Sequence, residues 1–104
     1  MAWHTISPAS RIRVGQVLSF VVAGRLLAVG RTENGYFAVD GVCPHAGGSL
    51  GEGEVEKECV ICPIHGFAYD VRSGRGLDDE ASVRVHRVEV DGDVLRVELP
   101  DESR

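Results

Sequence analysis

The sequence has few cysteines, and their number is odd. Three cysteines in 104 residues do not make the even set of a secreted disulfide framework. No apolar run approaches the length that crosses a bilayer, and the opening segment MAWHTISPASRIR lacks the apolar stretch of a signal peptide. We therefore expect a soluble protein of the reducing cytoplasm, without membrane association, whose thiolates serve as ligands.

Basic residues are also scarce. The chain has 11 Lys and Arg against 16 Asp and Glu, and its formal net charge is −5. Nucleic-acid binding depends on clustered Lys and Arg that neutralise phosphates. We therefore expect no nucleic-acid partner.

No segment shows a sustained helical period, and the length is that of one domain, residues 1–104. Runs rich in β-branched and aromatic residues predict strands, and Asn34-Gly35 and Asp91-Gly92 are hairpin signals. The apolar phase slips at His86-Arg87, which predicts a bulge. The expected strands are residues 17–23, 25–31, 36–40, 82–90 and 93–99. The fold class is all-β.

Residues 41–76 differ from the rest of the chain. They hold eight of the 13 glycines, in a stretch that interrupts the strand pattern. Loops of this kind commonly carry a functional site on a rigid scaffold. We expect a loop-rich subdomain inserted in a β base.

Two Cys/His pairs lie in this subdomain, Cys43-x-His45 and Cys62-x-x-His65, with 16 residues between His45 and Cys62. Two thiolates and two imidazoles suit a structural zinc ion in a zinc-stabilised interaction module. A zinc finger usually pairs Cys with Cys and His with His, however, whereas each loop here supplies one of each. Mixed pairs suit a binuclear centre in which one iron takes both thiolates and the other takes both imidazoles.

The segments CPHAGG and CPIHG, with SLGEGEV between them and YDVRSG after them, resemble the binding motif of Rieske [2Fe–2S] proteins. The resemblance is close over residues 43–74, and the length fits the small Rieske ferredoxins. It implies a Rieske fold, with the cluster subdomain on an antiparallel β-sandwich or open-barrel base. Cys43 and Cys62 would hold the inner iron, and His45 and His65 the outer iron.

The resemblance also implies roles for residues around the cluster. Glycines leave room for backbone amides to point at the sulfurs, and apolar residues exclude water. Residues next to the His ligands would contact the redox partner. The glycines are Gly47, Gly48 and Gly66, the shielding residues are Leu50 and Pro63, and the docking residues are Ala46 and Ile64.

The potential expected from the resemblance is low, roughly −150 to 0 mV. High-potential Rieske proteins carry a disulfide between the two cluster loops, at positions that are Gly48 and Ile64 here, and a Ser where this chain has Phe67. Tyr69 matches a Tyr that donates to a ligand sulfur in those proteins. Aromatic packing alone is the alternative role for Tyr69.

Cys59 also forms a Cys-x-x-Cys with Cys62, but we predict that it is a small strand residue and not a ligand. The acidic alternation from Glu52 to Glu58 would place four carboxylates on one face if the segment is extended. That face is either solvated or able to steer a basic partner.

No second motif for a flavin, nicotinamide or mononuclear iron is present. The resemblance therefore implies a monomeric one-electron carrier that catalyses nothing alone. It would shuttle electrons from a flavin-containing, NAD(P)H-linked reductase to a terminal oxygenase, such as an aromatic-ring-hydroxylating dioxygenase. The alternative within the family is the small subunit of an assimilatory NAD(P)H nitrite reductase.

Overall fold

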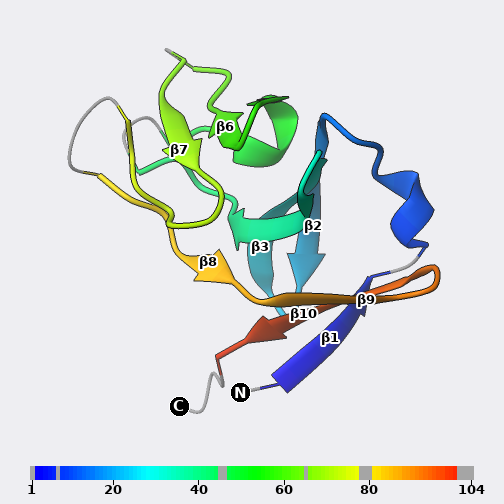
Figure 1. Cartoon of the computed structure of the whole chain (residues 1–104). Coiled ribbons are helices and arrows are strands. Elements are labelled where there is room, and N and C mark those ends of the chain that lie inside the picture. The colour runs from blue at the N-terminus through cyan, green and yellow to red at the C-terminus, as the bar shows by residue number, and fades with distance from the viewer. Residues whose placement is uncertain (1, 7, 45–46, 65, 78–80, 101–104) are drawn as a thin grey trace.

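A computed structural model describes residues 2–6, 8–44, 47–64, 66–77 and 81–100, and within them the chain is almost entirely β-structure (Figure 1). The strands are β1 (Ala2–Ile6), β2 (Gln16–Val22), β3 (Arg25–Thr32), β4 (Gly35–Asp40), β5 (Glu54–Glu56), β6 (Cys59–Ile61), β7 (Ala68–Asp70), β8 (Val85–His86), β9 (Val88–Asp91) and β10 (Val94–Leu99). Short 3₁₀ helices cover η1 (Ala9–Arg11) and η2 (Leu50–Glu52). No helix in the described part of the chain is long and apolar enough to cross a membrane.

The strands form three antiparallel sheets, in the orders β1-β10-β9, β2-β3-β4-β8 and β5-β6-β7. The first two make the base of the molecule. The third belongs to the inserted subdomain, whose strands β6 and β7 lie at the opposite end from β1 in Figure 1. The all-β fold with antiparallel sheets is confirmed.

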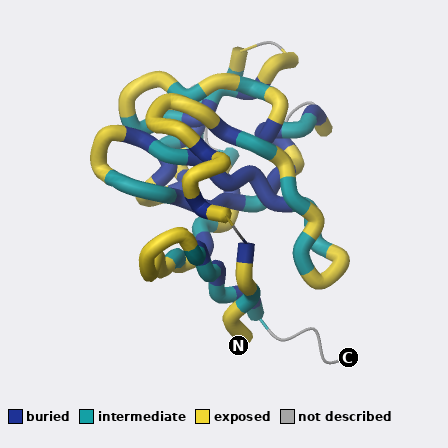
Figure 2. The backbone as a smooth tube through the Cα atoms, turned by 90° about the vertical axis from the view of Figure 1, so that its right-hand side faces the viewer, coloured by how far each residue is buried: buried dark blue, intermediate teal, exposed yellow. Residues whose placement is uncertain are grey.

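The sheet β2-β3-β4-β8 contributes to two cores, one on each face, because successive side chains of a strand point to opposite faces. Leu27 and Val29 of β3 enter a base core with Leu95 and Val97 of β10. Ala28, between them in sequence, belongs to a second core shared with the subdomain. Figure 2 shows the buried stretches running through the middle of the molecule, with exposed turns around them. The central sheet therefore packs against the β1 sheet on one side and the subdomain on the other.

The predicted strands 17–23, 25–31, 36–40 and 93–99 are confirmed as β2, β3, β4 and β10, whereas the predicted strand 82–90 is present only as two shorter strands, β8 and β9. The segment 82–90 is interrupted at Arg87, where a bulge was expected. The interruption is instead a change of sheet, since β8 pairs with β4 and β9 pairs with β10. The sequence analysis missed β1, whose residues are mostly exposed and which adds an edge to β10.

Candidate metal centre

The first cluster loop leaves the end of β4 and closes on itself. The Gly41 N–H donates to the Leu26 carbonyl at 3.0 Å, which fixes the loop's start against β3. The Cys43 N–H then donates to Gly48 at 2.9 Å, and the Gly47 N–H returns a bond to Cys43 at 2.8 Å. These bonds hold Cys43 with only 1% of its surface exposed.

The second cluster loop is the turn between β6 and β7. The Cys62 N–H donates to the Phe67 carbonyl at 2.7 Å, so the loop is closed just behind the thiol. Gly66 has φ of +73°, a left-handed conformation that a glycine adopts without strain. Cys62 is likewise 1% exposed.

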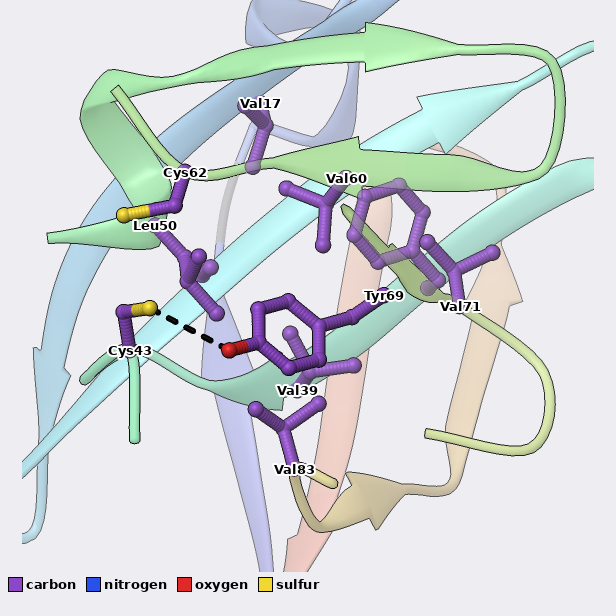
Figure 3. Close-up of a cluster of buried hydrophobic side chains, with 11 residues drawn as sticks. Val17, Val39, Cys43, Leu50, Val60, Cys62, Tyr69, Val71 and Val83 are labelled. Atoms are coloured by element: carbon purple, nitrogen blue, oxygen red, sulfur yellow. Dashed lines mark hydrogen bonds between the residues drawn. The ribbon is translucent and has the colours of Figure 1, made fainter. Parts of the chain in front are cut away.

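The two loops bring the two thiols together in the second core. Both side chains belong to that core, and the nearby Cys43 thiol is among the groups that raise the pKa of Cys62, after burial. A Cβ atom built at Gly48 would lie 3.3 Å from the Cys62 sulfur and 2.9 Å from Cδ1 of Ile64, so the first loop packs directly on the second. Both cysteines are free thiols, and Leu50 and Tyr69 pack in the same core (Figure 3).

The Tyr69 hydroxyl lies 3.2 Å from the Cys43 sulfur, and Figure 3 shows this contact as a dashed line. Tyr69 has no exposed surface. A phenol in this position donates to a thiolate, which has no hydrogen of its own to offer. The geometry therefore suits a ligand sulfur that carries negative charge.

Comparison with known families agrees with this geometry. The profile of the Rieske [2Fe-2S] domain matches residues 2–90. The chain belongs to the Rieske family.

Two curated relatives are matched by this Rieske chain over very different fractions of their own length. It is 30% identical over 95 residues to the ferredoxin component of the naphthalene 1,2-dioxygenase system of Pseudomonas putida, which covers 91% of each protein. It is 28% identical over 79 residues to the cholesterol 7-desaturase of Caenorhabditis elegans, and there it spans only 18% of the relative's length. The ferredoxin component is thus matched along nearly its whole chain, and the desaturase over one part.

Solved structures with the same fold include ferredoxins, nitrite reductase small subunits and terminal oxygenases. The ferredoxin of carbazole 1,9a-dioxygenase from Nocardioides aromaticivorans IC177 has a TM-score of 0.84 and 28% identity, covering 93% of this chain and 97% of that one. An NADH-dependent nitrite reductase small subunit from Mycobacterium tuberculosis has a TM-score of 0.84 and 26% identity, covering 92% and 93%. A complex of reduced oxygenase and oxidized ferredoxin in carbazole 1,9a-dioxygenase matches at a TM-score of 0.82 and 28% identity, covering 91% of each chain.

The cofactor of the Rieske family is a [2Fe–2S] cluster, and the two described donors suit it. Burial raises the pKa of the Cys62 thiol, while the N–H of Ile64, which donates to this sulfur, partly opposes that rise. Two adjacent buried thiols become thiolates when a metal supplies the positive charge. Cys43 and Cys62 therefore fit the sulfur side of the cluster.

The predicted ligands His45 and His65 lie outside the described residues, as does the predicted docking residue Ala46. Within the described ranges, no group of three or more His, Cys, Asp and Glu residues could hold a metal ion. The full ligand set of two Cys and two His thus stays a prediction from sequence.

The other predicted neighbours of the cluster differ in their surroundings. Leu50 is fully buried in the core with both cysteines, whereas Pro63 is exposed. Among the glycines, Gly48 is buried and Gly47 and Gly66 are exposed. The described contacts also add a donor that sequence reasoning missed. Ile64, predicted only as a docking residue, donates its backbone N–H to Cys62, a contact that spacing alone does not show.

Cys59 lies apart from the two buried thiols. It is half-buried on β6, where it pairs with Glu56 of β5 and Asp70 of β7. Burial raises the pKa of its thiol, and the negative charges of Asp70, Glu56 and Glu58 raise it further. These surroundings disfavour a thiolate ligand, in agreement with the predicted strand role.

The acidic segment is not one continuous face. Only Glu54–Glu56 is extended, because η2 ends at Glu52 and a turn at Lys57 and Glu58 reverses the chain. Glu58 accepts hydrogen bonds from Arg72 at 3.2 Å and from Asn34 at 2.8 Å. The expected face of four carboxylates is therefore divided, and Glu58 belongs to a separate network.

Proposed function

We propose that this Rieske chain is a one-electron carrier that accepts electrons from a flavin-containing, NAD(P)H-linked reductase and delivers them to a terminal oxygenase of the aromatic-ring-hydroxylating kind. The observation that carries the proposal is the match to a dioxygenase ferredoxin component over 91% of both chains. A neighbour in complex with its oxygenase supports the same type of partner. In this proposal the chain transfers electrons and catalyses no reaction alone.

Each part of the site has a role in the proposal. Cys43 and Cys62 hold the inner iron, and His45 and His65 hold the outer iron. When bound, the cluster accepts and releases a single electron. The chain's own residues exclude water from the thiolates, since both are 1% exposed, and donate hydrogen bonds from Tyr69 and Ile64. Residues 41–76 form the cluster subdomain of a single domain, 1–104.

The setting of the proposal is the cytoplasm, where the free thiols of Cys43, Cys59 and Cys62 stay reduced before the cluster is assembled. The carrier acts as a monomer, without a membrane or nucleic-acid partner. Light scattering of the purified protein tests the monomer.

The proposal is tested by analysing the purified protein for iron and acid-labile sulfide, and by its visible absorbance. We expect two irons and two sulfides for each chain and a coloured protein that is bleached on reduction. A colourless protein with one zinc would contradict it, because zinc has no redox chemistry and no visible absorbance. Family membership already argues against this zinc-stabilised module.

A nitrite reductase small subunit is a second candidate, because such a subunit from Mycobacterium tuberculosis matches at a TM-score of 0.84. The two candidates differ in the acceptor. Neighbouring genes for a reductase and an oxygenase, followed by substrate oxidation when the three proteins are combined, would support the first candidate. A neighbouring sirohaem nitrite reductase that this chain activates would support the second.

A further inference from the structure

A groove opens beside Cys62. It has a volume of ≈ 290 Å³ and is lined by residues of η2, β5, the end of β6 and the turn after β6. Besides two carboxylates, its lining residues are Gly53, Ile61, Cys62, Pro63 and Gly66. A Cβ at Gly53 would collide with the Ile61 carbonyl, so the two sides of the groove approach closely there. The groove therefore reaches a cluster ligand from the surface.

Two carboxylates also line this groove, from Glu52 at the end of η2 and Glu54 at the start of β5. Both residues are exposed, and neither side chain has an ion-pair or hydrogen-bond partner among the described residues. Glu58, by contrast, is paired with Arg72 and Asn34. No Lys or Arg is among the described residues that line the groove. The groove thus presents negative charge that no described residue neutralises.

We propose that this groove receives a lysine or arginine side chain of the redox partner, with Glu52 and Glu54 as its ion-pair partners. The proposal rests on the proposed function, which requires a partner close to the cluster. The aliphatic stem of a Lys or Arg suits the apolar side chains of Ile61 and Pro63, and its charged head suits the two carboxylates. The partner surface that docks here is therefore basic, and electrostatic complementarity would set its approach.

The chain offers a matched control for this proposal. Glu54 and Glu56 are both exposed residues of β5, two positions apart, but only Glu54 lines the groove. Replacing either one by Gln changes the net charge by the same amount. A larger effect of Glu54→Gln than of Glu56→Gln therefore indicates binding in the groove. Equal effects indicate only the influence of the overall electrostatic field of the protein.

The probe is horse-heart cytochrome c, a lysine-rich one-electron acceptor. Reduced carrier gives one electron to the ferric haem, which becomes ferrous while the carrier returns to its oxidised state. Stopped flow at low ionic strength gives the second-order rate constant, and calorimetry gives the affinity of the oxidised carrier for ferric cytochrome c. Ferricyanide serves as an anionic acceptor.

We expect Glu54→Gln to lower both the rate constant and the affinity about fivefold, the effect of one ion pair at a water-exposed contact. Glu52→Gln with Glu54→Gln lowers them further, and Glu56→Gln changes them by less than twofold. The rate with ferricyanide does not fall in any variant, and about 0.5 M salt removes the differences. Visible spectra identical to wild type show that the cluster is intact.

Equal losses in Glu54→Gln and Glu56→Gln would overturn the groove proposal, and so would unchanged values in Glu54→Gln. Failure of the proposed function looks different. In that case wild type would carry no reducible cluster, yet Glu54-dependent binding of cytochrome c would persist and support the groove alone. Loss of both the cluster and the Glu54-dependent binding would reject both proposals.

Discussion

Tyr69 is the residue through which the fold acts most directly on a ligand. Its hydroxyl reaches the Cys43 sulfur at 3.2 Å from within the fully buried second core. A donor to a ligand sulfur stabilises the more negative, reduced state of the cluster and so raises the potential. Sequence resemblance left packing and hydrogen bonding as alternative roles for Tyr69, and the structure shows that both are present.

We expect Tyr69→Phe to keep the cluster and to lower its reduction potential by roughly 40 mV, the equivalent of one hydrogen bond of about 1 kcal/mol. Redox titration near neutral pH measures it. Tyr36→Phe is the control, since the Tyr36 hydroxyl donates to the Ala9 carbonyl at 3.1 Å in the base. An unchanged value in Tyr69→Phe would leave Tyr69 a packing role, and a wild-type value above about +200 mV would reject the low-potential expectation.

The free thiols give a second prediction at this scale. Cys59→Ser should leave the visible spectrum nearly unchanged, because Cys59 lies on β6 among acidic neighbours and apart from the two buried thiols. Cys43→Ser and Cys62→Ser should lose the cluster or bind it poorly, and iron content of the purified variants measures this. Loss of iron from Cys59→Ser alone would show that the ligand assignment is wrong.

Single residues were predictable from sequence where spacing encodes chemistry, as in the pairing of Cys43 with Cys62. They were not predictable where the backbone conformation determines the contact. The Ile64 N–H that donates to Cys62 has no side-chain signal. Glu58 was expected beside Glu54, but the turn at Lys57, with φ of +57°, directs it to Arg72 instead.

At the scale of elements, Arg72 links the turn after β7 to the hairpin of β3 and β4. Its guanidinium donates to Glu58 at 3.2 Å, to the Tyr36 carbonyl at 3.3 Å and to the Thr32 hydroxyl at 3.3 Å. One planar side chain thus ties the inserted subdomain to the base. A lysine has a single ammonium and does not reproduce this fork.

We expect Arg72→Lys to destabilise the attachment of the subdomain by about 1 kcal/mol, because a half-exposed network contributes little more. The rate at which the visible absorbance disappears in urea should rise several-fold. Arg75→Lys, an exposed position in the same turn region, is the control and should match wild type. Equal rates for Arg72→Lys and wild type would show that Arg72 does not contribute to the attachment of the subdomain.

At the element scale, strands were predictable where the strand-forming residues and the turn residues between them agree, as in β2, β3 and β4. β1 was not, because four of its five residues are not buried and its place depends on the free edge of β10. The change of sheet at Arg87 was detected as a phase slip, but the slip does not say which partner each half takes.

At the scale of the whole molecule, the two cores differ in their relation to the metal centre. The base core contains no cysteine, whereas the second core contains both Cys43 and Cys62. When the metal is removed, the two buried thiols lose the positive charge that it supplies, and this loss affects the second core alone. The stability of the molecule is therefore expected to be uneven.

Cluster removal should raise hydrogen exchange in β6 and β7 far more than in β1 and β10. Exchange followed by mass spectrometry of the loaded and iron-free protein measures this difference. The hydrogen bonds between β1 and β10 serve as the internal reference, since these strands pack on the base core. A uniform loss of protection across both cores would contradict the division.

Because the first loop packs on Ile64, a reversible disulfide could join the two ligand loops. A Cβ at position 48 would lie 2.9 Å from Cδ1 and 3.2 Å from Cγ1 of Ile64, so side chains at these two positions are in direct contact, as a disulfide requires. The double variant Gly48→Cys with Ile64→Cys should therefore close under oxidant and open under a thiol reductant. We expect the closed form to lose iron to a chelator several-fold more slowly than the open form, and equal rates would mean that iron leaves without separation of the loops. A carrier built in this way would report the thiol balance of its surroundings through the lifetime of its own cofactor.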